Sequence, residues 1–529
     1  MRLKQAIAQT TLERLETPGA FDAIIIGSGA AGGLAAAELC ESGLNTLVLD
    51  AGLTPSVWQR PMTRSLNAAV KLLANPKALR FVPSKVAWKA RETLKLAGRY
   101  RQPIQSRCYA WEGLPNGFVD DLDNPYETPE DKPFNWVRAR HLGGRMVVPA
   151  HGKQYLRHGP ADFAPSDDLS PAWPFAPGTL DPWYTKVETR LALNGEMNGS
   201  EWIPDSKIAN TLTPDPAQAL MIKNITEEWP DTNPMLGRYT EPMKALDAAA
   251  QTGRLSCRKG AIASRIMVAK TGAVSGVEFV DQQSGRRLIV EAPVVFCCAS
   301  TLETTRLLLN SRQDTFLADT EESPLGRYIM DHVSVKVEGL MPDNGIADKQ
   351  FNLGNCVYLP RFDLRGGDTQ RTRGYGVRLY QVPGPPGKCY FTAVSDAEMF
   401  PRADNRVTLS TRKDRWDIPV LNISVAHGET EKSIAKEQVD AVREVAALLG
   451  VRLNTTDVQA SVPGSAIHEV GGARMGDDPA TSIVDPNNQC WQAQGLYVTD
   501  GACFPSIGLQ NPTLTIMALT ARACHHAST

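Results

Sequence analysis

With 529 residues the chain is longer than one hydrophobic core usually organises, so we expect two closely packed domains. Its 56 lysines and arginines against 58 aspartates and glutamates leave a formal charge of −2, which gives no long-range field for nucleic acid or anionic membrane. No stretch reaches the roughly 18 uninterrupted apolar residues of a membrane span. The charged N-terminus lacks a secretory apolar core, so we expect a soluble, cytoplasmic protein that acts on small molecules.

The first organised segment, residues 21–52, follows a strand, glycine turn, helix and strand pattern. Its turn reads Gly27-x-Gly29-x-x-Gly32 between an apolar strand and an alanine-rich helix, which is the context that gives this motif meaning. Gly27 permits the tight turn, Gly29 lets the backbone approach a pyrophosphate, and Gly32 lets the helix pack on the strand. Asp50 ends the second strand, where its carboxylate can bind ribose hydroxyls. A packing turn without ligand is the weaker alternative, and the turn does not distinguish NAD from FAD.

Two later segments complete the regular part of the chain. Residues 276–311 are typical of a hairpin, with Ser284 and Gly285 in its turn, followed by a buried strand and a helix. Residues 488–526 indicate a strand, a loop and a terminal helix opened by Pro512. The intervening stretches are irregular and rich in Pro, Trp, Asp and Arg. This asymmetry predicts one domain assembled from separated segments.

The spacing of the cysteines gives no indication of a metal-binding site. The ten cysteines are scattered without CxxC spacing, and several lie in apolar runs. We therefore expect buried free thiols rather than disulfides, a zinc site or an iron–sulfur cluster, and we predict no metal site.

Two further motifs suggest a ligand pocket far from the first turn. Gly143 and Gly144 follow a strand-like stretch in the sequence HLGGR, a pattern that fits an ordinary turn as well as a binding loop. The C-terminal block places His468 beside glycines, Asp500 after a strand, and Asn511 before the Pro512 that opens a helix. On the pattern alone a structural histidine is as good an interpretation of His468. Helix N-capping is the better interpretation of Asn511.

Together these motifs resemble the glucose–methanol–choline (GMC) oxidoreductases. The resemblance includes the GSGAAGG turn with its following acid and the HLGG loop, and it spans nearly the full chain in the family's order. Its other parts are Trp173–Tyr184, Val294–Ser311, Leu325–His332 and residues 468–523. Within the family the sequence is most similar to the glucoside 3-dehydrogenases and glycoside 3-oxidases, through HEVGGARMGDDP, ETTRLLLNS and VTDGACF…QNPTLTIMALTARA.

The resemblance implies a mixed α/β fold with a discontinuous Rossmann-like domain and a substrate domain built on a mixed β-sheet. The FAD-binding domain is expected to comprise residues 20–55, 138–160, 245–335 and 465–529. The substrate domain and surface insertions then comprise residues 56–137, 161–244 and 336–464.

The resemblance also implies roles for individual residues. His468 would take the hydroxyl proton of an alcohol, Asn511 would orient the same oxygen, and the hydride would pass to the flavin N5. The cofactor would be FAD, held by Gly27, Gly29, Gly32, Asp50, Gly143, Gly144, Ala263, Asp500, Pro512 and Thr513. Oxygen, a quinone and a redox partner protein all stay open as the electron acceptor.

Three departures from the family pattern refine these expectations. The loop after Gly144 lacks the small Ser/Thr-His or Trp pattern that commonly follows the glycines, so we expect FAD to bind non-covalently, with His151 as the residue to suspect otherwise. The cysteines that carry an iron–sulfur centre in some relatives are missing, since Cys297 and Cys298 lie in an apolar strand. Asp50 occupies a position where the family more often has Glu. The negative charge is kept, but the side chain is shorter.

The predicted function is the FAD-dependent oxidation of a secondary alcohol on a sugar or glycoside, at C3, to a 3-keto sugar. Aromatic residues suit a pyranose ring, although tryptophans in an irregular domain are more often core residues; the candidates are Trp111, Trp136, Trp173, Trp183 and Tyr184. The VVPAH insertion favours a bulky aglycone as much as free glucose. The alternatives are oxidation of a non-sugar alcohol, a GMC-type lyase, an NAD-dependent dehydrogenase and a non-catalytic flavoprotein subunit.

Overall fold

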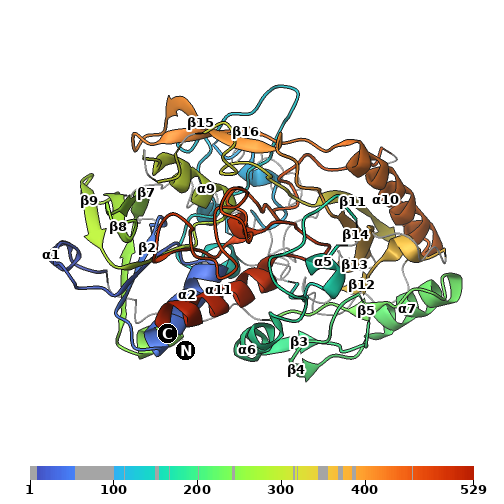
Figure 1. The fold of residues 1–529 in the computed structure, drawn as a ribbon. Coiled ribbons are helices and arrows are strands. Elements are labelled where there is room, and N and C mark those ends of the chain that lie inside the picture. The colour runs from blue at the N-terminus through green and yellow to red at the C-terminus, as the bar shows by residue number, and fades with distance from the viewer. Residues whose placement is uncertain are drawn as a thin grey trace, which may run out of the picture.

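A five-stranded parallel sheet organises the N- and C-terminal parts of the chain in the computed structural model (Figure 1). Its order is β18-β10-β1-β2-β6, and every pairing is parallel. Buried apolar residues dominate these strands, as expected for a parallel sheet that helices cover on its faces. The strands are β1 Ala23–Ile26, β2 Thr46–Asp50, β6 Leu255–Lys259, β10 Val294–Cys297 and β18 Leu496–Val498.

The structure describes most of the chain. The described ranges are residues 9–53, 101–111, 114–148, 154–165, 167–200, 202–240, 245–313, 316–318, 320–342, 356–366, 373–383, 389–454 and 457–529. The predicted VVPAH insertion lies only partly within them, and His151 lies outside the described residues.

Helices from both ends of the chain cover the parallel sheet. Helix α2 (Ala30–Glu41) connects β1 to β2, as the sequence predicts, and the C-terminal helix α11 (Thr513–Ser528) packs against it. Figure 1 shows the two helices, blue and red, lying side by side. Alanines and glycines dominate the buried residues of α2, so the neighbouring backbones can approach closely. Helices α8 (Ala245–Gln251) and α6 (Asp181–Leu191) pack on α2 and α11, respectively.

The predicted hairpin, strand and helix of the middle segment are confirmed. Strands β8 (Val274–Asp281) and β9 (Arg287–Glu291) form an antiparallel hairpin, and Gly285 in its turn has a φ of 72°. Strand β7 (Ala261–Val268) completes a three-stranded sheet. Helix α9 (Thr301–Asn310) follows β10 and packs against β7.

A second large sheet has the order β17-β11-β14-β13-β12-β5. We expected a mixed sheet, but all the pairings of its described strands are antiparallel. The long strands β11, β13 and β14 pair edge to edge along their lengths, so no crossover helix has to intervene. The strands are β5 Met235–Leu236, β11 Val333–Met341, β12 Val357–Leu359, β13 Tyr375–Pro383, β14 Cys389–Ala397 and β17 Arg452–Leu453.

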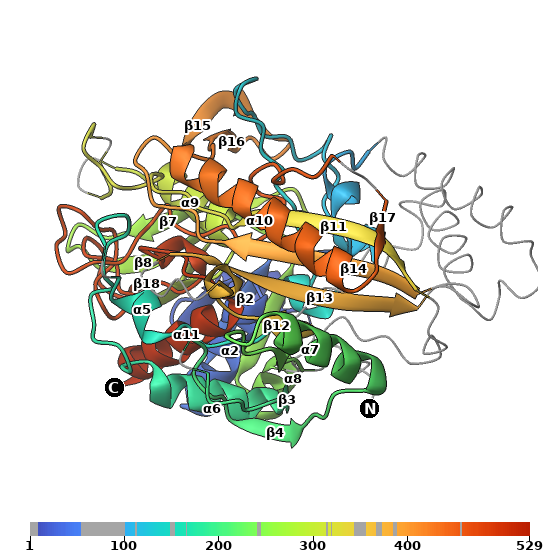
Figure 2. The ribbon, with the colours of Figure 1, turned by 90° about the vertical axis from the view of Figure 1, so that its right-hand side faces the viewer.

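Helix α10 (Glu429–Leu448) lies across this antiparallel sheet and packs on β11 and β14 (Figure 2). Its buried residues, among them Ala441, Val442 and Val445, recur at the helical period and face the sheet. The remaining elements are short or peripheral. They are α1 Leu12–Leu15, α5 Pro160–Phe163, α7 Pro216–Glu228, β3 Leu193–Gly195, β4 Ile208–Thr211, β15 Arg406–Lys413 and β16 Pro419–Ser424.

The two sheets draw their strands from different parts of the chain. Those of the parallel sheet lie within residues 20–55, 245–335 and 465–529. Those of the antiparallel sheet lie within 161–244 and 336–464, except that β11 begins at Val333. This distribution agrees with the two-domain division, which stays a proposal.

The cysteines are all free, and every one except the half-buried Cys389 is buried. Burial raises the pKa of buried thiols such as that of Cys257, to about 12, which makes them poor nucleophiles and metal ligands. Within the described residues, no cluster of His, Cys, Asp and Glu is arranged to hold a metal ion. None of the described helices combines the length and apolarity needed to cross a membrane.

Candidate active site

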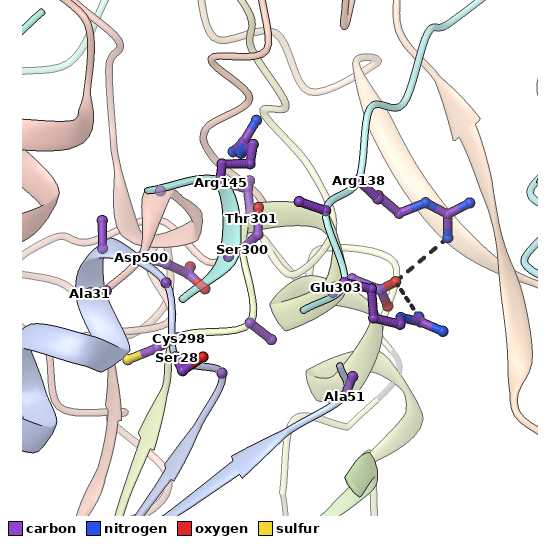
Figure 3. A pocket seen from close by; sticks show the side chains of 18 of the residues that line it. Ser28, Ala31, Ala51, Arg138, Arg145, Cys298, Ser300, Thr301, Glu303 and Asp500 are labelled. Atoms are coloured by element: carbon purple, nitrogen blue, oxygen red, sulfur yellow. Dashed lines mark hydrogen bonds and ion pairs between the residues drawn. The ribbon is translucent and has the colours of Figure 1, made fainter. Parts of the chain in front are cut away.

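A cavity opens where the carboxyl ends of the parallel strands meet. Gly27 follows β1, Asp50 ends β2, Cys298 follows β10 and Asp500 lies just beyond β18, and all four residues line it. Open parallel sheets bind ligands at this edge because neighbouring loops diverge there. Figure 3 shows Ser28, Cys298 and Asp500 near one another in the cavity wall.

The three glycines of the first turn have different surroundings. Gly27 has a φ of +96°, and a Cβ on it would lie 2.4 Å from the Cys298 carbonyl oxygen. A Cβ on Gly32 would lie 2.0 Å from the Gly27 carbonyl oxygen, so close packing of helix on strand requires glycine there. A Cβ on Gly29 would meet no atom within 4 Å. Gly29 therefore faces space that a ligand can use.

The HLGG loop is seated directly on this turn. The Gly143 N–H donates to Ser28 Oγ at 2.8 Å, and the same hydroxyl donates to Asp50. A Cβ on Gly144 would lie 3.1 Å from the Cα of Gly29. Gly143 and Gly144 both have positive φ, 87° and 53°, a conformation that glycine adopts without strain. The two predicted binding loops therefore form one wall of the cavity.

In this part of the cavity, the side chain of His141 has a ring nitrogen without a hydrogen-bond partner in the described part of the chain. His141 lines the cavity, and a Cβ on Gly52 would lie 2.2 Å from its Cα. Its buried Nε2 has no hydrogen-bond partner among the described residues. A buried polar atom of this kind normally has a partner, so the nitrogen fits a cavity that is completed by a polar ligand.

At another part of the cavity lies Ala263 of β7, together with a cluster of charges. Glu303 forms an ion pair with Arg138 at 3.5 Å (Figure 3). It forms a second ion pair with Arg140 at 3.3 Å. Burial opposes ionisation of Glu303, but Arg306, Arg140 and Arg138 lower its pKa to about 2. The carboxylate is therefore ionised and neutralises part of the arginine charge.

The loop that carries His468 is held by one buried carboxylate. Asp331 accepts the backbone N–H groups of His468 at 2.9 Å, Gly464 at 2.8 Å and Ala466 at 3.2 Å. Burial, reinforced by the neighbouring Glu469, raises the pKa of Asp331 to about 7. The three donors fix where the His468 side chain leaves the backbone.

His468 lies between two partners at the end of the cavity. Its Nε2 is 2.8 Å from Asn511 Nδ2, and its Nδ1 is 2.9 Å from His332 Nδ1. His332 Nε2 in turn lies 2.9 Å from the Gly508 carbonyl oxygen. Arg378 of β13 donates to Asn511 Oδ1. An imidazole nitrogen and an amide nitrogen thus meet where a substrate hydroxyl could be held.

The structure brings most of the predicted residues together. Lining one cavity are Gly27, Gly29, Asp50, Gly144, Ala263, His468, Asp500, Asn511, Pro512 and Thr513. Gly32 and Gly143 are not among the lining residues; Gly32 packs against the Gly27 backbone, and Gly143 donates its N–H to Ser28. The N-capping interpretation of Asn511 is wrong, because the cap residue of α11 is Pro512 and the Asn511 side chain bonds Arg378 and His468 instead.

Three residues of the site were not singled out by the sequence analysis. His332 and Asp331 are adjacent in the motif LGRYIMDH, which contributed only to the family resemblance. Arg378 lies inside a strand with no distinguishing local pattern. A histidine next to an acid immediately before a strand is a usable signal, whereas the position of Arg378 depends on how β13 pairs in the sheet.

Most of the predicted sugar-stacking aromatics belong to the core. Among the candidates only Trp136 lines the cavity, and Arg138 covers its ring with a guanidinium 4.0 Å from the centroid. Trp173 packs edge-on against Phe163 and Phe504. The others are Trp111, which is buried, Trp183, which packs on His525, and Tyr184, which bonds Thr515. Their aromatic faces therefore give no evidence for a sugar site.

Comparisons with known proteins relate the C-terminal part of the chain to an oxidoreductase family. Residues 401–520 match the family model described as GMC oxidoreductase. The 2-methyl-1,2-propanediol dehydrogenase of Mycolicibacterium austroafricanum is 25% identical, over 76% of this chain and 83% of the relative. The C-terminal part of the chain thus matches the GMC oxidoreductases. The 6'''-hydroxyparomomycin C oxidase of Streptomyces lividus is 24% identical, over 94% of this chain and 89% of the relative. The C-glycoside 3-oxidase of Arthrobacter globiformis is 24% identical, over 49% of this chain and 51% of the relative.

Solved structures share the fold of this chain. Pyridoxine 4-oxidase from Mesorbium loti superposes with a TM-score of 0.60 over 96% of this chain and 98% of that one, at 17% identity. GMC oxidoreductases are flavoproteins that bind FAD. The cavity fits this cofactor, because Gly29 leaves open space at the helix N-terminus and His141 Nε2 stands without a partner. Gly29, Asp50 and Ala263 would hold its adenosine and phosphate part.

The two neighbouring glycines give a matched pair of variants. We predict that Gly32→Ala lowers the free energy of unfolding of the apoprotein by about 1–3 kcal/mol, because its Cβ overlaps the Gly27 backbone. Gly29→Ala should leave that stability within about 0.5 kcal/mol but weaken FAD binding about tenfold or more, because its Cβ enters the ligand space. Urea unfolding and flavin-fluorescence titration measure the two effects. Equal FAD affinity in wild type and Gly29→Ala would contradict this placement.

Proposed function

We propose that this protein oxidises a secondary alcohol of a sugar or glycoside, with His468 as the base and Asn511 as the residue that orients the substrate oxygen. The observation that carries the proposal is the 2.8 Å contact between His468 Nε2 and Asn511 Nδ2 at the end of the cavity. These nitrogens supply one proton acceptor and one donor at the same place. An alcohol oxygen needs both when it loses its proton.

Alcohol oxidation removes the hydroxyl proton and the carbinol hydride together or in close succession. The imidazole of His468 can accept the proton through its unprotonated ring nitrogen. Asn511 holds the oxygen so that the proton points to the base. Bound FAD supplies the two-electron acceptor. Pro512 and Thr513, which line the cavity beside Asn511, complete its wall there.

We propose that FAD is bound non-covalently, because the loop after Gly144 lacks a recognisable attachment pattern. Acid precipitation of the purified protein is then expected to leave the yellow colour in the supernatant. Colour retained in the pellet would contradict the proposal, and His151→Ala would then test whether His151 is the attachment point.

The next prediction concerns His468 and Asn511. His468→Ala should lower turnover by about 10²- to 10⁴-fold, the usual range for removal of a general base, while FAD stays bound. Asn511→Ala should lower turnover less, because it removes an orienting hydrogen bond and leaves the base. His525→Ala, an exposed histidine near the C-terminus, serves as the matched control and should keep full activity. Wild-type turnover in flavin-loaded His468→Ala would remove His468 from the chemistry.

The substrate class is proposed from the relatives, two of which are named for oxidising a C-glycoside and a paromomycin derivative. We predict oxidation of a pyranose or glycoside at C3, which gives a 3-keto sugar. Anaerobic titration with sugars, glycosides, choline and aryl alcohols should bleach the flavin with a member of the sugar group, and NMR of the product then locates the ketone. A ketone at C2, an aldehyde at C6 or a lactone at C1 would contradict the C3 assignment and leave the flavoenzyme proposal intact.

The same titration separates the alternatives. Bleaching by a non-sugar alcohol alone would favour the diol- or pyridoxine-type relatives. Product formation without bleaching would identify a lyase, and a colourless protein that turns over with NAD would identify a nicotinamide enzyme. No reaction with any alcohol would favour a non-catalytic subunit. Oxygen uptake in the turnover assay distinguishes oxygen from a quinone or a partner protein as the electron acceptor.

A further inference from the structure

A continuous run of polar contacts passes through the catalytic histidine. It begins at the Gly508 carbonyl, continues through His332, His468 and Asn511, and ends at Arg378. His332 and Arg378 are both buried, at 2% and 8% exposure, so water does not readily replace a missing partner. Two of the five groups, the carbonyl and the guanidinium, can play only one hydrogen-bonding role.

From the Gly508 end, the run fixes the protons of both imidazoles. A carbonyl oxygen only accepts, so His332 Nε2, 2.9 Å from it, must carry a proton. Burial lowers the pKa of His332 to about 3, so the ring is neutral and its Nδ1 is an acceptor. His468 Nδ1, 2.9 Å away, must therefore be the donor of that pair. A neutral His468 then carries its lone pair on Nε2.

From the opposite end, the contacts of Arg378 favour the same arrangement. A guanidinium has only donors, so the Asn511 atom that it contacts must be the amide oxygen. The amide nitrogen then faces His468, and because it only donates, His468 Nε2 must accept at 2.8 Å. Arg378 is itself held by the carboxylate of Asp396 on the neighbouring strand β14. The orientation of Asn511 is thus determined by the antiparallel sheet.

We propose that His332 and Arg378 are positioning residues that lock His468 in the tautomer with its proton on Nδ1 and its lone pair on Nε2, facing the substrate. This proposal rests on the proposed role of His468 and Asn511. In the other neutral tautomer, Nε2 would carry a proton and could not take one from an alcohol. It would also oppose a donor on Asn511 and leave Nδ1 facing the acceptor of His332. Both neighbours therefore disfavour the inactive tautomer.

The lock also stabilises the product of proton transfer. Once Nε2 has taken the substrate proton, Nδ1–H still donates to His332, and that hydrogen bond strengthens because the donor is now cationic. Charged groups near the ring come from several segments, and one of them is Arg145, which pairs with Glu469 and donates to the Ile467 carbonyl. Asp331 binds the His468 backbone, Glu469 follows it in the chain, and Arg378 reaches it through Asn511.

Leucine and asparagine at position 332 give a matched test, because the two side chains share one branched shape and differ in polarity. The probe is ¹⁵N NMR of the FAD-loaded protein with labelled histidines, eight in the chain, and the His468→Ala spectrum assigns His468. At a pH where His468 is neutral, the wild type should show pyrrole-type Nδ1 and pyridine-type Nε2. His332→Leu should shift both signals toward a tautomer mixture and lower kcat about tenfold or more with little change in KM. His332→Asn, whose amide oxygen can accept, should recover much of both.

The outcomes separate this inference from the proposed function. A pyrrole-type Nε2 in the wild type, or unchanged His468 signals in His332→Leu, would overturn the tautomer lock even if alcohols bleach the flavin. Another outcome is that the two variants lose the same fraction of kcat while the His468 signals stay unchanged. That result would likewise assign His332 a packing role only. If the predicted signals appear but no alcohol reduces the flavin, the lock stands and the proposed function fails. Arg378→Lys, which keeps a donor toward Asn511, should retain the wild-type signals and adds a check from the opposite end.

Discussion

The hydrogen bonds that Asp331 accepts are the interaction on which the site depends. The carboxylate is fully buried just before β11, and it gathers three backbone N–H groups from residues 464–468. Without this acceptor the buried donors would be unsatisfied, at a cost of about 1–3 kcal/mol each. The bonds join a strand of the antiparallel sheet to the loop that reaches the parallel sheet. His468, the proposed base, is therefore placed by a contact between the two parts of the fold.

The parallel part of the fold could be predicted from local signals in the sequence. The turn at Gly27, the Ser284-Gly285 hairpin and the helix after Pro512 each have turn or cap chemistry that acts over a few residues. The antiparallel sheet was expected to be mixed because the family resemblance implied it, since these segments show no clean local pattern of their own. Their pairing is set by contacts between residues far apart in the chain, such as β11 with β14, which no local pattern encodes.

The residues of the candidate site also divide into those that local sequence signals reveal and those that only long-range contacts place. The glycines stood out by their local spacing, whereas His468 and Asn511 received their roles from the family resemblance, and the cavity brings nearly all of them together. Asn511 shows how a local rule can mislead, since Asn before Pro predicts a cap but tertiary partners take its side chain. Arg378 could not be found in this way. Its importance comes only from the register that places β13 opposite the loop before α11, and a single sequence does not display that register.

The position of Arg378 on the antiparallel sheet has a consequence for changing what the enzyme accepts. In many enzymes the segment that recognises the substrate can be exchanged while the proton-transferring groups stay fixed on a separate scaffold. Here Arg378 lies on β13, and His332 directly precedes β11. Both strands belong to the antiparallel sheet, which is part of the proposed substrate domain. Transplanting that sheet from a relative would therefore also transplant the electronic setting of the base. Under the proposed roles of these residues, selectivity and acid–base chemistry are inherited together in this architecture.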